Sequence, residues 1–243
     1  MIRFHAPDIA DNPTLPESDS QHCIRVLRMK EGDEIEVVDG YGSVFRCRIA
    51  VAHPKRTLLE IIERHALPKV WLPEITIAIA PTKHLDRMEW LVEKLVEIGV
   101  DNIVPLKCRH SERKELKVER LEKIAVSAMK QSLKAILPHI SEMVPLNSFI
   151  SQNAGSTALR YIGYCDSATE RRLLARDYVP GKDVIVMIGP EGDFSPEEVK
   201  ASTEAGFVPV TLGDNRLRTE TAALVACDTI QIINQRYTSD KNQ

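Results

Sequence analysis

The residues best placed to do chemistry lie in two short stretches in the C-terminal half of the chain. IGPEGDFSPEEV (188–199) and LGDNRLRTETAAL (212–224) each follow a strand-like apolar run, carry glycine and lead into a helix. Glycine lets the backbone approach a ligand where a side chain would block it. Such loops at the carboxyl ends of parallel strands are where α/β proteins bind small molecules. The pair therefore predicts a crevice for a small ligand between two adjacent strand ends. Either loop alone could be a plain connection.

The second stretch holds the charged groups that could act on a bound ligand. Arg216 and Arg218 are two residues apart, and only one of them is expected to face the crevice. Arg218 stands directly before a helix, where its guanidinium and the helix N-terminal amides could stabilise developing negative charge. The alternative is that Arg218 only orders the loop. Glu220 is a candidate proton acceptor. The alternative is that its negative charge only interacts favourably with the positive end of the helix dipole.

Both loops carry signals for the start of a helix. Ser195, Pro196 and Glu198 form the pattern of an N-cap with a capping box. In the second stretch Thr219 or Thr221 is the expected cap. The helix that follows is apolar nearly all round, which indicates burial, often at a subunit interface. We therefore expect an oligomer.

The glycine patterns exclude two common nucleotide sites. The chain has no GxxxxGK[ST] motif and no GxGxxG fingerprint. Its glycine loops also fall late in the domain rather than after the first strand, which argues against NAD and against the common Rossmann-type methyltransferases.

The elements that position these loops divide the chain in two. EIEVVD, SVFRCRIAVA and TLLEIIERH alternate in polarity between turn signals, which predicts a small β-barrel over residues 1–70. In this barrel Arg46 and Arg48 share one face, and Phe45 and Cys47 the other. ALPKVWLPE, residues 66–74, is the expected linker.

Residues 75–243 alternate between strand and helix patterns. The predicted strands are ITIAIA, NIVPL, HISEMV, LRYIGYC, DVIVMIG and FVPVTL. The predicted helices include LDRMEWLVEKLVEI, which ends at Gly99, and residues 118–136, which stop before Pro138. This alternation predicts an α/β domain with a parallel sheet covered by helices on both faces.

Composition narrows the class of protein further. The formal net charge of −3 argues against a uniformly basic nucleic-acid binder, although KCRHSERK (107–114) could be a phosphate-contacting loop or the start of a solvated helix. The five scattered cysteines show no zinc spacing and are expected to be reduced and mostly buried, and no metal site is expected. No apolar run is long enough to span a membrane, so the expected location is cytoplasmic.

Three motifs in order resemble one family. HCIRVLRMKEGD (22–33), EKLVEIGVDNIVPL (93–106) and the two glycine loops are similar to those of the small-subunit (16S) ribosomal RNA uridine-N3 methyltransferases of the SPOUT superfamily, the RsmE type. The resemblance covers the whole chain. It implies a PUA-like β-barrel that helps to hold RNA, and a SPOUT-type α/β domain with a trefoil knot. It also implies a homodimer with its active site at the subunit interface.

The resemblance also implies the ligands and the residues that bind them. S-adenosyl-L-methionine is the implied cofactor, and small-subunit ribosomal RNA, as a ribonucleoprotein, is the implied substrate. The cofactor motifs match Ile188, Gly189, Pro190, Glu191, Gly192, Leu212, Gly213, Leu217, Arg218, Thr219, Thr221 and Ala222. The expected RNA contacts are Arg3, His22, Arg25, Arg28, Arg46, Arg48, Lys83, Arg87, Arg109, Arg113 and Lys114.

Several positions depart from the family pattern, two of them in the glycine loops. The usual Gly-Pro-Glu-Gly-Gly ends here in Asp193, which adds a carboxylate beside the pocket. The usual Gly-x-Arg-Ile-Leu-Arg becomes a sequence in which the first arginine, Arg216, is displaced by one residue.

The implied reaction is methyl transfer to N3 of a uridine, with Arg218 and Glu220 as the candidate catalytic residues. The alternatives are a non-catalytic RNA-binding assembly factor and a SPOUT methyltransferase acting on another base or on tRNA.

Overall fold

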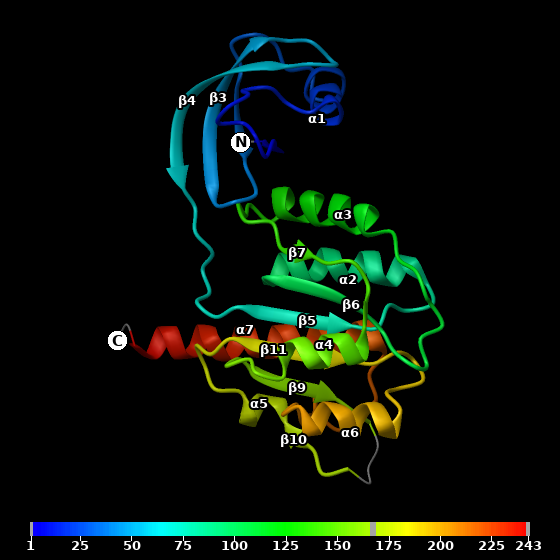
Figure 1. The fold of residues 1–243 in the computed structure, drawn as a ribbon. Helices are drawn as coiled ribbons and strands as arrows, with labels where there is room; N and C mark the ends of the chain where they lie inside the picture. Colours follow the sequence, from blue (N-terminus) through cyan, green and yellow to red (C-terminus); the bar gives the residue numbers. More distant parts are fainter. Residues whose placement is uncertain (1, 166–168, 242–243) are drawn as a thin grey trace. The chain divides into compact units, whose positions relative to one another are not determined.

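The computed structural model describes residues 2–165 and 169–241, with no side-chain detail beyond residue 238 (Figure 1). Its contacts group into two compact units. The first comprises residues 1–70 and 126–137, and the second comprises residues 71–125 and 138–243. The sequence analysis expected the first 70 residues to form a domain, but it did not expect residues 126–137 to belong with them.

The first unit is built on a four-stranded sheet. Its order is β1 (Arg3–His5), β2 (Glu34–Val38), β3 (Ser43–Val51) and β4 (Leu58–Ala66), with β1 parallel to β2 and the other pairs antiparallel. The three strands predicted between residues 34 and 66 are confirmed. Phe45 and Cys47 are buried while Arg46 and Arg48 face outward, as the alternation predicted. Two helical turns, α1 (Glu17–Gln21) and the π-helical η1 (His22–Val26), precede β2.

Helix α3 (Val118–Gln131) ends five residues before the predicted end at residue 136, so that prediction was wrong. Leu133 adopts φ +56°, a left-handed conformation that stops an α-helix. The amide of Lys134 then donates to the carbonyl of Met129. The released backbone pairs within the first unit, where Gly42 N–H donates to the Ala135 carbonyl and Leu137 N–H donates to the Gly40 carbonyl.

The second unit contains an eight-stranded sheet in which all pairs are parallel, as predicted. Along the sheet its strands are β10 (Arg172–Leu173), β12 (Val208–Thr211), β9 (Leu159–Gly163), β11 (Val184–Ile188), β5 (Ile75–Ile79), β6 (Asn102–Lys107) and β7 (His139–Ile140), and β8 (Val144–Pro145) also pairs with β6. HISEMV was predicted as one strand. It forms the separate strands β7 and β8 because each pairs with a different part of β6.

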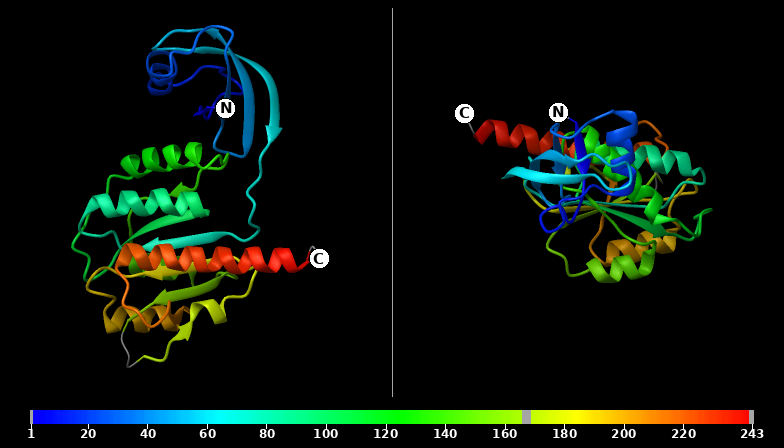
Figure 2. Two further views of the ribbon diagram at one scale, coloured as in Figure 1. Left: turned by 180° about the vertical axis from the view of Figure 1, so that it is seen from behind. Right: turned by 90° about the horizontal axis from the view of Figure 1, so that it is seen from above.

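Helices cover both faces of this sheet (Figures 1 and 2). Helices α4 (Leu146–Asn153) and α6 (Pro196–Glu204) share a buried cluster with Ala78 and Ala80. Alternate residues of β5 point to the other face, where α7 (Thr219–Lys241) packs on β5 and β11. Helix α2 (Leu85–Ile98) packs on α7, and the short α5 (Leu174–Asp177) also contacts α7.

Gly99 closes α2 where that helix meets α7. Its φ is +117°, and its carbonyl accepts a hydrogen bond from Gln231 Nε2 at 2.7 Å. A Cβ built there would lie 2.7 Å from the ring of Trp71 and 2.9 Å from Gln231 Nε2. The predicted helix end at this glycine is confirmed, and the close approach explains why no side chain fits.

Among the described residues, no helix combines the length and the apolarity that crossing a membrane requires.

We expect Gly99→Ala to lower the free energy of unfolding by roughly 2 kcal/mol or more, because it adds both backbone strain and a clash. Both tryptophans of the chain, Trp71 and Trp90, lie in the second unit, so denaturation followed by tryptophan fluorescence reports on it. The matched control is Gly155→Ala, where the added Cβ meets nothing within 4 Å. Equal midpoints for the two variants would contradict the prediction.

Candidate active site

A cavity of about 1060 Å³ lies at the carboxyl ends of β9, β11 and β12. Both predicted glycine loops contribute to it, as the sequence analysis expected. The strand ends are not adjacent, however, because β9 lies between β11 and β12 in the sheet. The cavity is lined by Arg87, Gly163, Tyr164, Cys165, Arg171, Ile188, Gly189, Pro190, Glu191, Gly192, Asp193, Phe194, Val210, Thr211, Leu212, Gly213, Asp214, Asn215, Arg216, Leu217, Arg218, Thr219 and Ala222.

The first glycine loop is held by its two carboxylates. Glu191 Oε1 accepts the backbone N–H of Lys83 at 3.0 Å, which ties the loop to the segment between β5 and α2. Asp193 Oδ2 accepts the N–H of Cys165 at 3.0 Å, which ties it to the end of β9, and Asp193 Oδ1 accepts the N–H of Phe194 at 2.8 Å. Three strand-end segments are thus joined through backbone amides.

Asp193 occupies a position that favours glycine. Its φ is +60°, in the left-handed region where aspartate is tolerated better than most residues. The departure from the family's usual glycine is therefore compatible with the loop conformation. The helix start that follows is confirmed, since Ser195 and Glu198 form a complete capping box and Pro196 is the first residue of α6.

The second glycine loop differs from prediction in two respects. Both Arg216 and Arg218 line the cavity, although only one arginine was expected to face it. Helix α7 begins at Thr219, so Thr219 and Thr221 lie in its first turn rather than at the cap position. Side chains two residues apart in an extended segment lie on the same side, which is why the expectation of a single arginine was wrong.

Glu220 pairs with Arg87, a residue that lines the cavity. The Glu220 side chain is buried, with 6% of the residue exposed, and it is not among the residues that line the cavity. Its Oε1 lies 3.6 Å from Arg87 Nη1, while Oε2 is buried with no hydrogen-bond partner among the described residues. A buried carboxylate is retained when it has a cationic partner. Arg87, which does line the cavity, supplies that charge.

Arg113 is engaged inside the protein rather than free for a ligand. Its Nε donates to the Thr82 carbonyl at 3.2 Å and its Nη2 donates to the Lys83 carbonyl at 2.7 Å. The Lys83 ammonium pairs with Glu112 at 2.8 Å, and this hydrogen bond raises the pKa of Lys83. Arg113 therefore ties its loop to the segment that leads to Arg87, and an RNA contact at Arg113 stays a prediction.

Two other predicted RNA contacts of the second unit lie on the surface. Arg109 pairs with Glu197 at 3.0 Å, and both side chains are mostly exposed. Exposed ion pairs of this kind contribute little to the stability of the protein, so either side chain can exchange its partner at low cost. Lys114 is exposed.

The predicted RNA contacts of the first unit fall into three groups. The Arg3 side chain is only 9% exposed and its guanidinium donates twice to Glu36, so it is not available to a phosphate. Arg46 and Arg48 share Glu34 and each also pairs with a second glutamate, Glu63 and Glu60 respectively, so this face carries little net positive charge. His22, Arg25 and Arg28 are exposed in and just after η1.

Gly163, Tyr164, Cys165 and Arg171, with Val210 and Thr211 at the end of β12, also line the cavity and were not among the predicted site residues. The first three end the strand LRYIGYC, and the rule that parallel strands present their carboxyl ends at one edge could have found them. Arg171 had no sequence signal. In the part of the chain that the structure describes, no group of three or more His, Cys, Asp or Glu side chains could hold a metal ion.

The cavity suits a ligand that is partly apolar and carries charges of both signs, because its lining includes four arginines and the carboxylates of Glu191, Asp193 and Asp214. Its apolar wall includes Ile188, Leu212, Leu217 and Ala222, and its guanidinium groups come from Arg87, Arg171, Arg216 and Arg218. The exposed backbone of the loops supplies both hydrogen-bond donors and hydrogen-bond acceptors. Small-molecule sites are typically mostly apolar with a few placed polar groups.

Family models match both parts of the chain. Residues 70–231 match an RNA methyltransferase domain and residues 15–62 match an RNA methyltransferase PUA domain. Among curated relatives, "Ribosomal RNA small subunit methyltransferase E" of Synechocystis is 32% identical over 219 residues, covering 88% of this chain and 70% of that protein. The protein of the same name from Aquifex aeolicus is 30% identical, covering 86% of this chain and 90% of the relative.

Solved structures of methyltransferases have folds similar to that of this chain. A probable rRNA-methyltransferase from Porphyromonas gingivalis is 48% identical with a TM-score of 0.92, covering 98% of this chain and all of that one. Ribosomal RNA small subunit methyltransferase E from Neisseria gonorrhoeae, bound to S-adenosyl methionine, is 28% identical with a TM-score of 0.81, covering 96% and 98%. The α/β fold with a PUA-like N-terminal domain is therefore confirmed. The chain belongs to the RNA methyltransferase family that includes ribosomal RNA small subunit methyltransferase E.

Proposed function

We propose that the protein transfers a methyl group from S-adenosyl-L-methionine to N3 of a uridine in small-subunit (16S) ribosomal RNA. The observation that carries this proposal is the cavity at the ends of β9, β11 and β12, which is built from the two loops that match the family's cofactor motifs. Family membership supports the reaction class, and the structure of the Neisseria relative holds S-adenosyl methionine.

The residues of the cavity fit this cofactor. The apolar side chains of Ile188, Leu212 and Leu217 would hold the adenine, and loop backbone groups would hydrogen-bond its edge. An arginine such as Arg171 or Arg216 would pair with the carboxylate of the amino-acid part. When bound, S-adenosyl-L-methionine supplies a methyl group activated by the positive charge on sulfur.

The protein must also favour the anionic form of the uridine. N3 of uridine carries a proton and is a poor nucleophile until that proton leaves. The negative charge then spreads onto the flanking carbonyl oxygens. Arg218, which lines the cavity directly before α7, would stabilise this charge together with the amides of the first helical turn.

Glu220 has a positioning role in this proposal. It was a candidate proton acceptor, but its carboxylate pairs with Arg87 and lies outside the cavity lining. Its negative charge keeps the Arg87 guanidinium directed toward the cavity mouth, where Arg87 would contact the RNA. Lys83, Arg109 and Lys114 of the second unit, with His22, Arg25 and Arg28 of the first, are further proposed RNA contacts. Arg46 and Arg48 are retained as weaker ones.

We also propose that the active form is a homodimer and that the C-terminal segment is knotted. Helix α7 packs on α2, β5 and β11, and it still leaves Ile232 49% exposed. A helix that is apolar nearly all round is buried, often at a subunit interface. A knot would account for the path of the chain from β12, near one edge of the sheet, back to α2 and β5. The cytoplasmic location stays a prediction.

The test of this function is to map modified nucleosides in ribosomal RNA from a deletion strain and from the same strain carrying the gene. We expect one N3-methyluridine in 16S RNA to disappear and to return on complementation. Loss of a modification from tRNA, or at another base, would favour a different methyltransferase. Unchanged modification and no binding of S-adenosyl-L-methionine by calorimetry would favour an assembly factor without catalytic activity.

We expect Arg218→Ala to lower kcat about a hundred-fold or more, because one preorganised donor to the developing anion is lost. Cofactor affinity measured by calorimetry should change little. Arg171→Ala is the matched control, since it removes an arginine of the same cavity proposed to contact the cofactor and should raise the cofactor Kd. Near-normal turnover of Arg218→Ala would show that this residue only orders the loop.

We expect Arg87→Gln and Glu220→Gln each to lower kcat/KM about ten-fold or more, and the double variant to fall no further, because the two side chains act as one unit. The pH profile of kcat should keep its shape in Glu220→Gln. If Glu220 is instead the proton acceptor, Glu220→Gln will lose far more activity than Arg87→Gln and the acidic limb of the profile will disappear.

Cys165 offers a direct probe of cofactor binding, because it lines the cavity and is the exposed cysteine of the five. Burial raises the pKa of all five thiols, to about 11 for Cys23 and Cys47 and to about 12 for Cys108, so exposure to the reagent is what distinguishes Cys165. We expect iodoacetamide to alkylate Cys165 first, and S-adenosyl-L-methionine at ten times its Kd to slow that reaction about ten-fold. Peptide mass spectrometry locates the label. Protection of a buried cysteine but not of Cys165 would argue against this cofactor position.

A further inference from the structure

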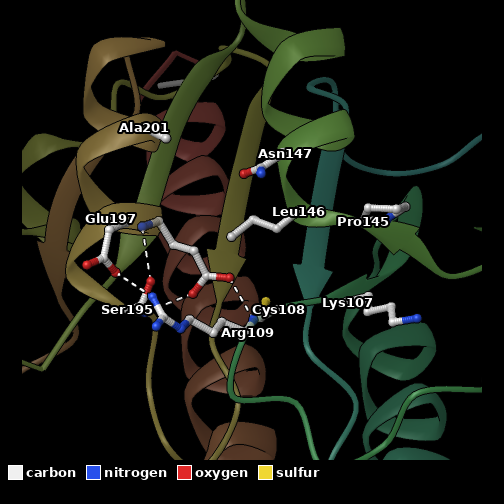
Figure 3. A pocket seen from close by; sticks show the side chains of 10 residues that line it. Lys107, Cys108, Arg109, Pro145, Leu146, Asn147, Ser195, Glu197 and Ala201 are labelled. Atoms are coloured by element: carbon white, nitrogen blue, oxygen red, sulfur yellow. Dashed lines mark hydrogen bonds and ion pairs between the residues drawn. The ribbon is translucent and has the colours of Figure 1, made fainter.

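A second cavity, of about 600 Å³, lies beside the proposed methyl-transfer site and shares no lining residue with it (Figure 3). Three segments form it: the end of β6 with the residues that follow, the β8–α4 junction, and the start of α6. All three belong to the second unit. Its volume is sufficient for one nucleotide.

The two cavities lie on either side of one loop. Gly192 and Asp193 line the methyl-transfer cavity, and Ser195, two residues later, lines the second one. His110 Nδ1 lies 3.0 Å from the Asp193 carbonyl, in hydrogen-bonding contact, and His110 directly follows Arg109 of the second cavity. A single strand of RNA with one base in the first cavity would therefore pass the second.

In one wall of the second cavity the polar groups already have hydrogen-bond partners. Glu198 Oε2 accepts the N–H of Ser195 at 2.8 Å, and Glu198 Oε1 accepts the N–H of Arg109 at 2.7 Å. The capping box thus already pairs the amides of Ser195 and Glu198. A phosphate would have to bind elsewhere in the cavity.

The remaining groups match a nucleotide. Pro145, Leu146 and Ala201 give an apolar surface against which a base can lie, and the Asn147 amide can both donate and accept at a base edge. Lys107 is exposed at one end of the cavity, away from the Arg109–Glu197 pair at the other (Figure 3). Its ammonium is placed to contact a phosphate, and Arg109 can exchange its exposed partner for a second one.

We propose that this cavity binds an unpaired nucleotide of the ribosomal RNA other than the one that is methylated. The inference rests on the proposed function, because it takes its ligand from the same RNA strand. It assigns to the loop KCRHSERK a role in binding a flanking nucleotide, separate from methyl transfer.

The test fills the cavity without changing its charge. Ala201→Trp should raise the KM for small ribosomal subunits about ten-fold, the order of one lost base contact, while kcat and the Kd for S-adenosyl-L-methionine stay within about two-fold. The control is Thr203→Trp, which places the same bulk at an exposed position of α6. Equal KM values for the two variants, or a weaker cofactor Kd in Ala201→Trp, would overturn the proposal.

A second experiment tests binding to this cavity and does not depend on catalysis. Ultraviolet cross-linking of the wild-type protein to small ribosomal subunits should attach a nucleotide to a peptide containing Pro145–Asn147 or Lys107. Lys107→Gln should reduce that cross-link, whereas Lys200→Gln, on exposed α6 surface, should not. Cross-linking of a ribosomal protein there, or no cross-link while other peptides of the protein react, would overturn the proposal. If the wild-type protein cross-links but transfers no methyl group, the proposed function fails and the nucleotide site stands.

Discussion

Two carboxylates that accept backbone amides hold the candidate active site together. Glu191 reaches the N–H of Lys83 and Asp193 reaches the N–H of Cys165, so one loop joins the segments that follow β5, β9 and β11. These segments would otherwise be independent strand-end loops. Because the acceptors are side chains of the glycine loop itself, its shape depends on both neighbours being in place. The conformation of Asp193, at φ +60°, is part of the same arrangement.

The partners of each charged side chain in the fold decide whether it is available to a ligand. Most arginines that look available in the sequence are paired: Arg3 with Glu36, Arg46 and Arg48 with a row of glutamates, and Arg113 with backbone carbonyls. The methyl-transfer cavity combines four arginines, Arg87, Arg171, Arg216 and Arg218, with the carboxylates of Glu191, Asp193 and Asp214. The net charge of −3 therefore says little about the charge of any one site. The glutamates of the first unit would also limit non-specific binding to phosphates.

The fold was largely predictable because its signals are local. Alternation marked β2, β3 and β4, the buried runs marked β5, β6, β9, β11 and β12, and Gly99 marked the end of α2. The errors arose where distant segments decide the structure. Helix α3 stops at Gln131 because residues 134–137 pair with Gly40 and Gly42 rather than continuing the helix. HISEMV divides because β6 offers two separate pairing positions.

In the site, local sequence patterns were enough to predict the two glycine loops, the capping box at Ser195 and the candidate arginine at Arg218, since each depends on neighbours in the chain. The three-dimensional fold was needed to see that β9 lies between the two loop-bearing strands, that Arg216 and Arg218 share one cavity, and that Glu220 pairs with Arg87. Strand order and ion pairing depend on which faces the sheet and helices bury together. That is a property of packing between segments far apart in the chain, and no local pattern encodes it.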